Sequence, residues 1–509
     1  MAYIAPRFQS PLPPMALRDH PIVVVGAGMV GLTVALDLAR RGQKVVVLDD
    51  DDTVSVGSRA ICHAKRSLEI FARLGLGAAV LAKGVTWNRG RVFFGAKQVY
   101  DFDLQAEAGH RFPAFVNLQQ YHLEALLVDA CNATGLIDLR WKHEVCGLSP
   151  DDGLVSVDTP HGAYDLRADW ILAADGTRSF VRRTMGLPFT GTQFPDRFLI
   201  ADVTMEADFP PERWFWFEPE FHPGGSVLLH RQADKVWRID FQLGADADAA
   251  LERDPDRVRA RVAAMLGPDA VFNLEWVSIY SFRCRRLNRF RHGKVLFLGD
   301  AAHQVSPFGA RGGNSGVQDA DNLAWKLDAV QRGLAPETLL DSYDAERIPA
   351  SDENIRHSVR STEFIAPKSA AARAYRDAAL DLSAHFPFAR ALVNSGRLSR
   401  PAVLAGSPLN TPDSNAWTGG VPPGAVAEDA PVAGGWLLDQ LNLGFTVLRF
   451  AAPDGNPHLF VAPTGIAAAR YDATAGTTVL FRPDGHVAGR WRHYDPDLVA
   501  AACLTALGA

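Results

Sequence analysis

The sequence is poor in the residues and patterns that define several classes of protein. Its 509 residues include only 5 cysteines, and because these are scattered and never form a Cys-x-x-Cys pair, they predict neither a disulfide framework nor a zinc site. No stretch of about 18 uninterrupted apolar residues is present, so we expect no membrane-spanning helix. The first 20 residues contain 4 prolines and no apolar run typical of a signal peptide. We therefore expect a cytoplasmic protein whose leading segment is either a flexible arm or an extended segment clamped to the body.

An excess of charge of one sign is also lacking. Charged residues make up 22% of the chain and its formal net charge is -6 at pH 7, which predicts neither a nucleic-acid-binding surface nor a membrane-adsorbing one. No Gly-x-Ser-x-Gly nucleophile elbow and no His/Cys cluster at metal-ligand spacing occurs, so we expect no protein nucleophile and no metal. Hydrophobic residues reach 47%, enough for large cores, and the length predicts two or three domains.

Changes in periodicity predict how the chain is divided. An apolar run at 22–25, a glycine-rich turn, an apolar-periodic stretch at 30–40 and a second apolar run at 45–48 predict a βαβ unit. Further along, short alternating runs predict an inserted antiparallel sheet, after which the βα pattern returns. The expected division is a discontinuous first domain at 20–190 and 291–397, a sheet domain at 191–290, a linker at 398–428 and a last domain at 429–509.

The strongest local motif is the glycine turn Gly26-x-Gly28-x-x-Gly31, which follows the first predicted strand and opens the first helix. In such a turn the first glycine permits the tight bend, the second lets the backbone approach a pyrophosphate, and the third lets the helix pack on the sheet. Asp49 stands at the end of the next strand, where its carboxylate would bind a ribose hydroxyl. The motif therefore predicts a dinucleotide site, with a purely structural turn as the alternative.

Three separated motifs resemble those of the p-hydroxybenzoate hydroxylase-like (group A) FAD-dependent aromatic monooxygenases. After the glycine turn, an Asp-Gly pair at 175–176 and a Gly-Asp pair at 299–300 stand in the family's order and at suitable spacing. The tail segment Arg-Pro-Asp-Gly at 482–485 resembles the phenol hydroxylase and 3-(3-hydroxyphenyl)propionate hydroxylase branch. The resemblance implies an α/β fold with an α+β insertion: a Rossmann-like FAD-binding domain, an antiparallel-sheet substrate domain and a small thioredoxin-like C-terminal domain.

The resemblance also implies which residues hold FAD. Asp300 would accept a hydrogen bond from a ribityl or ribose hydroxyl, with a helix N-cap as its alternative role. The glycine-rich segment at 309–313 would present backbone amides that stabilise negative charge on the reduced flavin. Ala310 and Arg311 depart from the family's usual residues there, and Arg311 could be an added cation near the ring. The predicted cofactor-binding residues are Gly26, Gly28, Gly31, Asp49, Arg59, Gln120, Asp175, Asp300, Pro307, Gly312, Gly313 and Asn314.

The reaction that this resemblance implies is hydroxylation of a phenolic ring. NADH or NADPH would reduce FAD, O2 would add to give a flavin C4a-hydroperoxide, and the distal oxygen would be transferred to an electron-rich ring in a dry pocket. Since only one glycine fingerprint is present, we expect no separate Rossmann site for the nicotinamide. The expected partners are O2 and a small phenolic substrate, with a phenolic acid as one option. The tail would stabilise the fold or a subunit contact such as that of a homodimer.

The substrate is expected to contact the inserted sheet, where aromatic and polar side chains alternate. The candidates for catalysis are His230, Arg231 and Tyr280. The candidates for substrate contact are Trp214, Trp216, Arg238 and Gln242. For each of these side chains, a structural place in a core or on a surface is the alternative.

Three other functions compete with the hydroxylase. A flavin-dependent halogenase shares the fold and carries Trp-x-Trp-x-Ile-Pro, which the segment at 214–219 approaches without the isoleucine. A flavin-dependent reductase or dehydrogenase would make no hydroxylated product. A flavoprotein kept only as a binding module would have lost its chemistry, although the glycines and Asp300 are intact.

Overall fold

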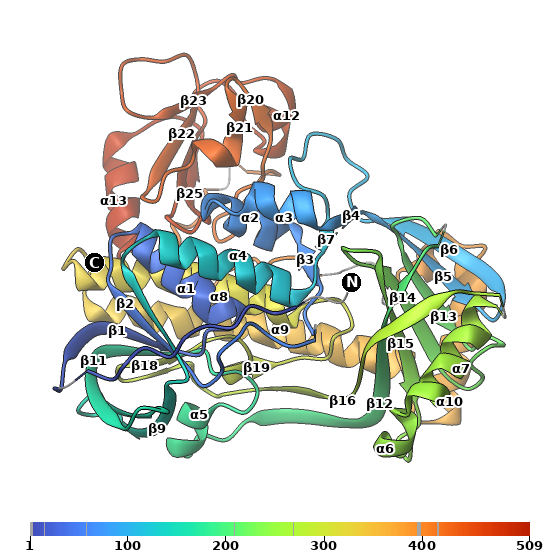
Figure 1. Ribbon diagram of the computed structural model, residues 1–509. Coiled ribbons are helices and arrows are strands. Elements are labelled where there is room, and N and C mark those ends of the chain that lie inside the picture. The colour runs from blue at the N-terminus through green and yellow to red at the C-terminus, as the bar shows by residue number, and fades with distance from the viewer. Residues whose placement is uncertain are drawn as a thin grey trace.

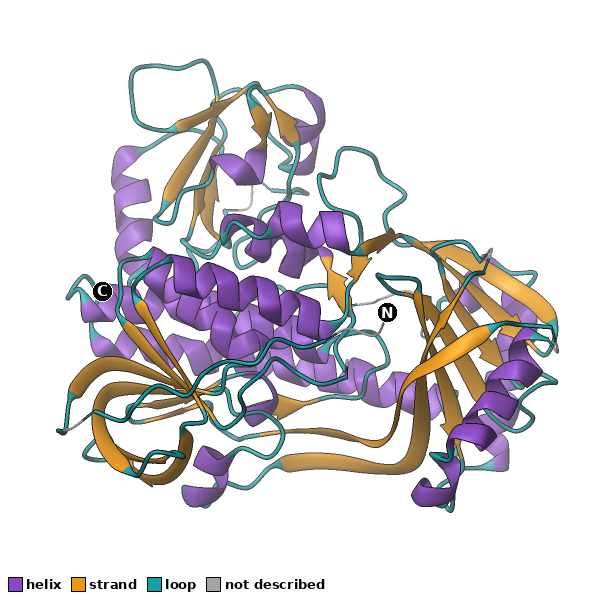
Figure 2. Cartoon of the chain, viewed as in Figure 1, coloured by secondary structure: helices purple, strands orange, loops and turns teal. Residues whose placement is uncertain are grey.

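Two large sheets stand at opposite ends of the molecule, with a layer of helices between and above them (Figure 1). The computed structural model describes residues 4–14, 16–57, 59–207, 209–267, 269–393, 399–414 and 417–509. The C-terminal unit lies over the helical layer, on the side away from the first sheet (Figure 2). The predicted boundary at 397–398 lies outside the described residues.

The first sheet is the core of the dinucleotide-binding fold. Its strands run in the order β17-β18-β11-β1-β2-β8, and neighbours from β18 to β8 pair in parallel. The runs Ile22–Val25 of β1 and Val45–Leu48 of β2 are apolar and buried, as expected for strands covered on both faces. The bounds are β1 (Asp19–Val25), β2 (Val45–Asp49), β8 (Ile137–Trp141), β9 (Glu144–Ser149), β10 (Leu154–Asp158), β11 (Tyr164–Ala173), β17 (Arg291–His292) and β18 (Val295–Phe297).

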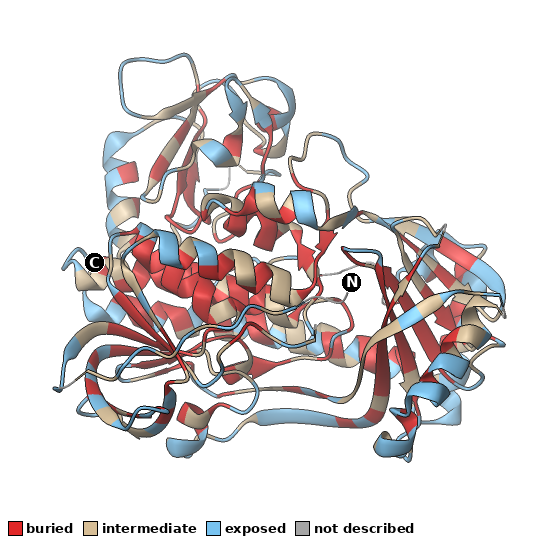
Figure 3. Cartoon of the chain, in the orientation of Figure 1, coloured by how far each residue is buried: buried red, intermediate tan, exposed pale blue. Residues whose placement is uncertain are grey.

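Helices α1 (Met29–Arg40), α4 (Gln120–Ala133) and α8 (Gly312–Gln331) form the layer on this sheet, with α1 contacting the other two. Figure 3 shows α1 and much of α8 as buried. The other helices are α2 (Lys65–Arg73), α3 (Gly77–Lys83), α5 (Phe180–Thr184), α6 (Ala249–Glu252), α7 (Pro255–Leu266), α9 (Asp341–Ile365), α10 (Ala370–Ser383) and α11 (Pro387–Arg390). Short 3-10 turns occupy η1 (Gly299–Ala301) and η2 (Glu337–Leu340).

The second sheet has the order β19-β16-β12-β15-β14-β13-β5-β6. Two long strands, β12 and β16, run from the first domain into this sheet and join the two parts (Figure 1). The bounds are β5 (Arg89–Phe94), β6 (Lys97–Asp103), β12 (Thr190–Met205), β13 (Arg213–Phe217), β14 (Ser226–Arg231), β15 (Val236–Leu243), β16 (Phe272–Arg286) and β19 (His303–Gln304). A small sheet of β3 (Cys62–Ala64), β7 (Phe115–Asn117) and β4 (Val85–Trp87) lies beside it.

One part of the predicted division is wrong. The segment 89–103 falls within the predicted first-domain range 20–190, but β5 pairs in parallel with β13 and so belongs to the second sheet. A parallel pairing between strands more than a hundred residues apart leaves no local pattern in the sequence. The substrate sheet is therefore built from two separate segments.

The leading segment is clamped to the body. The backbone N–H of Phe8 donates to the carbonyl of Asp52 at 2.7 Å, and the ring of Phe8 stacks on Trp141 with centroids 4.4 Å apart. Of the two expectations for this segment, the clamped one holds at Phe8, whereas Ile4 and Leu12 are exposed.

The C-terminal unit has a four-stranded sheet in the order β23-β22-β24-β25. Its elements are β20 (Pro431–Val432), β21 (Gly435–Trp436), η3 (Leu437–Gln440), β22 (Thr446–Phe450), β23 (Leu459–Val461), α12 (Gly465–Arg470), β24 (Thr478–Phe481), β25 (Val487–Trp491) and α13 (Pro496–Ala506). Strands β22 and β23 are parallel, whereas β24 and β25 run antiparallel to their neighbours. The thioredoxin-like assignment of this unit stays a prediction.

A buried network of charges joins this unit to the helical layer. Arg482, in the turn after β24, donates to Glu346 on α9 at 2.5 Å and to Asp484 at 2.6 Å. Glu346 also accepts from Lys326 on α8 at 2.7 Å, and all four side chains are fully buried. Arg66 on α2 donates to the carbonyl of Asp484 at 2.5 Å. The sequence motif at 482–485 is therefore an anchor of the C-terminal unit on three helices.

Candidate functional site

The glycine turn has the backbone that a phosphate-binding loop requires. Gly26 adopts φ 105°, and a Cβ there would approach the carbonyl oxygen of Ala174 to 2.6 Å. A Cβ on Gly31 would overlap the carbonyl oxygen of Gly26, so the first turn of α1 can sit this close only without a side chain. At Gly28 a Cβ would meet nothing closer than Glu124, 3.8 Å away. Gly28 therefore leaves open space in front of the helix rather than relieving a clash within the protein.

The N-terminus of α1 is suited to an anionic ligand. Its N-cap is Gly28, no side chain caps the helix, and its first turn carries no acidic residue. The amides of such a first turn, together with the helix dipole, attract phosphate. One amide, that of Met29, is already bound to the carboxylate of Glu124 at 3.1 Å.

Gln120 and Glu124 fix the loop that leads to Arg59. Glu124 accepts from the amide of Ser55 at 2.8 Å and from the Gln120 side chain at 2.8 Å. The Gln120 carbonyl oxygen in turn accepts from the amide of Ala60 at 3.1 Å. Glu124 was not among the predicted site residues, although its spacing of four from Gln120 on one helix face was a usable signal.

Asp49 lies at the end of β2, directly beneath the turn. Its carboxylate accepts from the amides of Ala27 at 2.5 Å and Asp51 at 2.9 Å. Burial raises the pKa of Asp49 to about 6, against the opposing effect of these two amides. Each carboxylate oxygen keeps further acceptor capacity for a ribose hydroxyl.

Asp300 lies next to the glycine turn in space. A Cβ on the preceding Gly299 would come within 3.1 Å of the Val30 side chain in α1. Among the described residues, no group donates a hydrogen bond to the Asp300 carboxylate. Burial raises its pKa, while His303 and Arg59 act to lower it. A half-buried carboxylate that lacks a donor among the described residues fits the hydroxyl groups of a bound cofactor.

Three buried side chains, those of Asp319, His303 and Arg347, support the backbone directly before Asp300. Asp319 on α8 accepts from the amide of Gly299 at 3.1 Å, from His303 at 2.6 Å and from Arg347 at 2.7 Å. Burial acts to raise the pKa of Asp319, but the charges and hydrogen bonds of His303 and Arg347 lower it to about 2. Asp319 and Arg347 were missed in the sequence, because their separation of 28 residues is bridged only in the folded helices.

The segment 307–314 bends back on itself ahead of α8. Gly309 and Ala310 have positive φ values of 97° and 53°. Arg311 is buried and donates to the carbonyl of Phe308 at 2.8 Å, so its guanidinium supports the loop from within. Asn314 accepts from the amide of Ala64 at 2.8 Å and from the hydroxyl of Ser67 at 2.7 Å, which ties this loop to α2.

The start of α8 completes the cradle. A Cβ on Gly313 would approach the Met29 side chain to 2.7 Å, so the N-termini of α1 and α8 lie close together. Helix α8 has neither a side-chain cap nor an acidic residue in its first turn. Gly312 and Pro307 flank the same loop, and a Cβ on Gly312 would meet only the Val305 side chain, 3.5 Å away. Two uncapped helix ends and the carboxylate of Asp300 thus fit an extended dinucleotide such as FAD.

The Asp-Gly segment at 175–176 braces this region. The carboxylate of Asp175 accepts from the amide of Val181 at 3.0 Å, and its second oxygen is buried without a partner among the described residues. Burial raises the pKa of Asp175. Arg182 lies over the ring of Phe189, with its guanidinium carbon 4.2 Å from the centroid. Asp175 lies beside Gly26, because a Cβ on Gly26 would come within 3.1 Å of the Asp175 Cα.

The inner face of the second sheet carries a row of polar side chains. By the strand register, Arg213 of β13, His230 of β14, Arg238 of β15 and Asp202 of β12 follow one another across neighbouring strands. Arg238 forms a bidentate ion pair with Asp202, at 2.8 and 2.7 Å, and also approaches the carbonyl of Arg59 at 3.5 Å. This row therefore faces the first domain.

His230 is buried in that row. Its Nδ1 has no partner among the described residues, and its ring lies edge-on to Trp87 at 6.3 Å. Burial, together with the charges of Arg213 and Arg238, lowers its pKa well below the usual value. The imidazole is consequently neutral at pH 7.

Three predicted residues lie on the other face. Trp214 and Trp216 pack in the hydrophobic cluster on the outer side of the sheet, and Arg231 lies over Trp237 of that same cluster at 5.8 Å. Successive residues of a strand point to opposite faces, so these side chains cannot line one site with His230 and Arg238. We correct the prediction accordingly: the inward residues of β13 are Arg213, Phe215 and Phe217, one position away from the two tryptophans.

The remaining candidates lie inward. Gln242 accepts from the amide and hydroxyl of Ser226, at 3.1 and 2.9 Å, which gives it a structural role at the end of the sheet. Tyr280 stacks edge-on to Phe282 with centroids 4.9 Å apart, and burial raises the pKa of its phenol well above the usual value. Tyr280 is therefore protonated at pH 7.

A small cavity opens between this inner face, the loop at 308–309 and the end of α9. Its walls are largely aromatic, with two arginines among them. The lining residues are Arg91, Val92, Phe102, Arg213, Phe215, Phe217, Phe308, Gly309, Ser361, Phe364, Ile365 and Val393. Aromatic walls with a few polar groups are typical of sites for small aromatic ligands.

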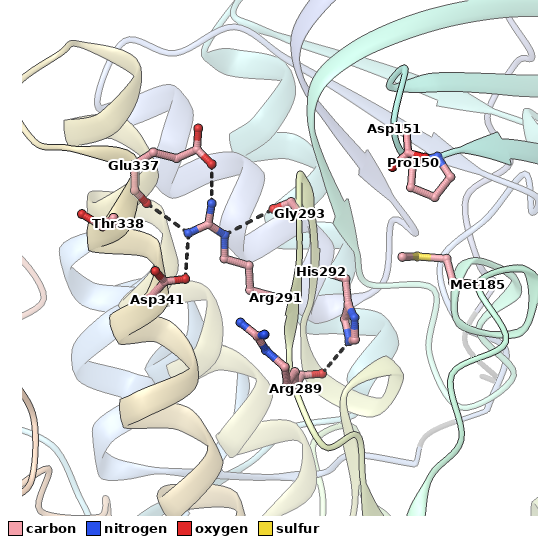
Figure 4. A pocket seen from close by; sticks show the side chains of 10 residues that line it. All are labelled: Pro150, Asp151, Met185, Arg289, Arg291, His292, Gly293, Glu337, Thr338 and Asp341. Atoms are coloured by element: carbon pink, nitrogen blue, oxygen red, sulfur yellow. Dashed lines mark hydrogen bonds and ion pairs between the residues drawn. The ribbon is translucent and has the colours of Figure 1, made fainter.

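A larger groove of about 690 Å³ lies elsewhere, at the edge of the first sheet (Figure 4). Arg291 lies at its wall, where it donates to Asp341 at 2.9 Å and pairs with Glu337. Arg289 donates to Asp344 at 3.2 Å. Because these two arginines are paired and the groove is open and remote from the glycine turn, we do not include it in the site.

Asp240 predicts a pH-dependent stability. It lies in the next inward row, has a buried oxygen without a partner among the described residues, and burial raises its pKa to about 7. An acid whose folded-state pKa is raised holds its proton more tightly when folded, so stability is lost as pH rises from about 4 to 7. Asp240→Asn should remove that loss and stabilise the protein at pH 8 by up to about 4 kcal/mol.

The measurement is the difference in free energy of unfolding between Asp240→Asn and the unchanged protein, by urea titration from pH 5 to pH 8. The difference should grow with pH and level off above pH 7. A difference that is constant over this range would contradict the assignment. Asp246→Asn, in a solvent-facing loop, serves as the control and should show no trend.

Within the described residues, no group of three or more His, Cys, Asp or Glu side chains could hold a metal ion. Nor does any described helix combine the length and apolar character needed to cross a bilayer.

Comparison with known proteins identifies the family. Residues 19–358 match the FAD binding domain family, and the chain belongs to it. Three curated relatives are monooxygenases or hydroxylases. They are 6-methylpretetramide 4-monooxygenase of Streptomyces rimosus (34% identity, 71% of this chain and 65% of the relative), a flavin-dependent monooxygenase of Mycobacteroides abscessus (31%, 92% and 96%) and 3-(3-hydroxy-phenyl)propionate/3-hydroxycinnamic acid hydroxylase of Mycolicibacterium smegmatis (28%, 94% and 84%).

The fold comparison agrees. The crystal structure of the flavin-dependent monooxygenase PieE with FAD and substrate superposes with a TM-score of 0.81 at 23% identity, covering 96% of this chain and 99% of that one. The predicted family, the mixed α/β fold and the cofactor FAD are confirmed. The relatives also favour a flavin-dependent aromatic hydroxylase over a halogenase or a reductase.

Proposed function

We propose that the protein adds one hydroxyl group to a phenolic ring, with FAD as bound cofactor, NADH or NADPH as reductant and O2 as oxidant. In the balanced reaction the ring carbon exchanges hydrogen for hydroxyl, the nicotinamide is oxidised, and the second oxygen atom leaves as water. The observation that carries the proposal is the position of Asp300. Its donor-free carboxylate lies beside the phosphate turn, in the domain that faces the aromatic-walled cavity.

The residues of this chain bind and orient the reactants. Gly26, Gly28 and the first turn of α1 would hold the pyrophosphate, and Asp49 and Asp300 would accept hydroxyl hydrogen bonds. When bound, FAD supplies the reducing equivalents and the activated oxygen. The uncapped start of α8 would stabilise negative charge on the reduced ring.

The cavity side chains would exclude water and hold the substrate ring. Phe215, Phe217, Phe308 and Phe364 form apolar walls that suit a planar aromatic molecule. The relative that acts on 3-(3-hydroxy-phenyl)propionate supports a phenolic acid as the substrate class.

Substrate-stimulated consumption of NADH or NADPH, with mass analysis of the products, tests the proposal. The expected result is that one or more phenols in a panel raise the rate of consumption and gain about 16 mass units, which corresponds to one oxygen atom per turnover. Peroxide as the sole product would favour a reductase or oxidase. Incorporation of bromide or chloride would favour a halogenase and would overturn the proposal.

A further inference from the structure

The arginines around the cavity differ in whether their charge is compensated. Arg91 forms an ion pair with Glu212 at 2.6 Å, and Arg238 pairs with Asp202 at 2.7 Å. Arg213, between them in the strand order, makes no hydrogen bond or ion pair with any described residue. It is therefore the cavity arginine whose charge the described part of the protein leaves without a direct partner.

The surroundings of Arg213 only partly compensate for the lost hydration of its half-buried side chain. Burial lowers the pKa of Arg213, and the more distant Cys62, Asp240 and Tyr100 only partly offset this. Burial raises the pKa of the Cys62 thiol to about 12, so Cys62 is neutral at pH 7 and supplies no negative charge. A cation held this way is stabilised most by an anion that reaches it.

The neighbours of Arg213 supply no fixed negative charge at contact distance. Asp240 lies in the next row of the same face, beyond ion-pair distance, and its pKa of about 7 leaves it partly protonated. His230, the cross-strand neighbour, is neutral and its Nδ1 lacks a partner among the described residues. Two buried polar atoms without partners thus accompany the uncompensated arginine.

The position of Arg213 explains why no described side chain pairs with it. Its side chain lines the aromatic cavity, so part of its surface is open to whatever the cavity holds. An aromatic ring between the phenylalanines would place a substituent oxygen within reach of the guanidinium, which prefers anionic oxygen acceptors.

We propose that Arg213 is the specificity-determining residue that binds an anionic oxygen of the aromatic substrate. This inference rests on the proposed function only in calling the bound ligand a substrate. The role given to Arg213 concerns binding and not turnover. A phenolate and a carboxylate present the same chemistry to a guanidinium, and the experiment separates the two.

The test uses the FAD-loaded protein without NADH or NADPH. The probes are 4-nitrophenol, whose phenolate absorbs visible light, and 3-phenylpropionate, which has a carboxylate and no phenol. The dissociation constant of each probe is measured from the change in flavin absorbance, and the phenolate fraction of bound 4-nitrophenol is measured at pH 6.

The variants are Arg213→Gln, Arg213→Lys and the control Arg91→Gln, which removes an arginine of the neighbouring strand that is paired with Glu212 and lies over Trp214 on the outer face. Arg213→Gln should weaken binding of at least one probe about 10- to 100-fold, as expected for a lost charge-assisted hydrogen bond. Arg213→Lys should recover part of that loss, and Arg91→Gln should change binding less than about 3-fold.

The outcomes are distinct. Loss confined to 3-phenylpropionate assigns Arg213 to a carboxylate, whereas loss of 4-nitrophenol binding and of its phenolate signal assigns it to the phenolate. Unchanged binding of both probes in Arg213→Gln, or an equal loss in Arg91→Gln, would overturn the inference. If Arg213→Gln cannot be loaded with FAD, Arg213→Lys alone must bind at least one of the two probes more weakly than the unchanged protein. If binding depends on Arg213 but no phenol is hydroxylated, the result would contradict the proposed function and leave this inference intact.

Discussion

Gly28→Ala should yield a folded protein that binds FAD at least about 100-fold more weakly, a loss of about 2.7 kcal/mol of binding free energy. A Cβ at this position meets only Glu124, at 3.8 Å, so the fold itself can accept it. The same methyl group would occupy the space through which a pyrophosphate approaches the helix amides. The measurement is titration of the flavin-free protein with FAD, followed by flavin fluorescence.

Alanine substitutions at two other glycines serve as comparisons for this test. Gly244→Ala places a methyl group where nothing lies within 4 Å, and it should leave FAD binding unchanged. Gly31→Ala would overlap the carbonyl oxygen of Gly26, so it should lower the free energy of unfolding as well as FAD binding. If Gly28→Ala retains FAD as tightly as Gly244→Ala, the glycine turn is not the phosphate site.

Glu346→Gln should destabilise the protein by about 3–5 kcal/mol. Glu346 accepts from Arg482 at 2.5 Å, from Lys326 at 2.7 Å and from Asn322 at 2.6 Å, and it is fully buried. Glutamine keeps the size but removes the charge, which leaves two buried cations with only Asp484 to balance them. The measurement is the midpoint of urea-induced unfolding, followed by far-UV circular dichroism.

A surface ion pair provides the control. Arg259 and Asp256 form an exposed pair at 2.9 Å on α7, and Asp256→Asn should cost less than about 1 kcal/mol. An equally small effect of Glu346→Gln would mean that the network at 482–485 does not anchor the C-terminal unit. A second transition at low urea in that variant would instead show this unit separating first, as the anchor predicts.

The pattern of apolar residues and glycines was sufficient to predict the first strands and the first helix of the first domain. The predicted strand at 22–25, helix at 30–40 and strand at 45–48 correspond to β1, α1 and β2, because buried parallel strands and a glycine-opened helix are encoded by neighbouring residues. The pairing of β5 with β13 was not predictable in this way, since it joins segments far apart in the chain.

The candidate site was predictable where a motif dictates backbone shape. Gly26 and Gly31 are required by close backbone contacts, and the structure brings them beside Asp300 as the motif order suggested. The group of side chains that supports Gly299 was not predictable, because Asp319 and Arg347 meet only when α8 packs on α9. Ion pairs between helices leave no periodic signal in a single sequence.

The inward face of the second sheet could not be identified from the sequence, for a different reason. The segment at 213–217 reads Arg-Trp-Phe-Trp-Phe, so both alternating sets of side chains are largely aromatic. Alternation shows that two faces exist but does not show which one the first domain covers. Aromatic rings with polar tips predict Trp214 and Trp216 as substrate contacts, whereas Arg213, Phe215 and Phe217 are the residues of this strand that line the cavity.

The most direct test of this account is a crystal structure of the protein with FAD and a phenol bound. We expect the pyrophosphate against the first turn of α1, a cofactor hydroxyl on Asp300, and the phenol between the flavin ring and the inner face that carries Arg213. A flavin bound away from the turn at 26–31, or a phenol on the face that carries Trp214, would contradict it.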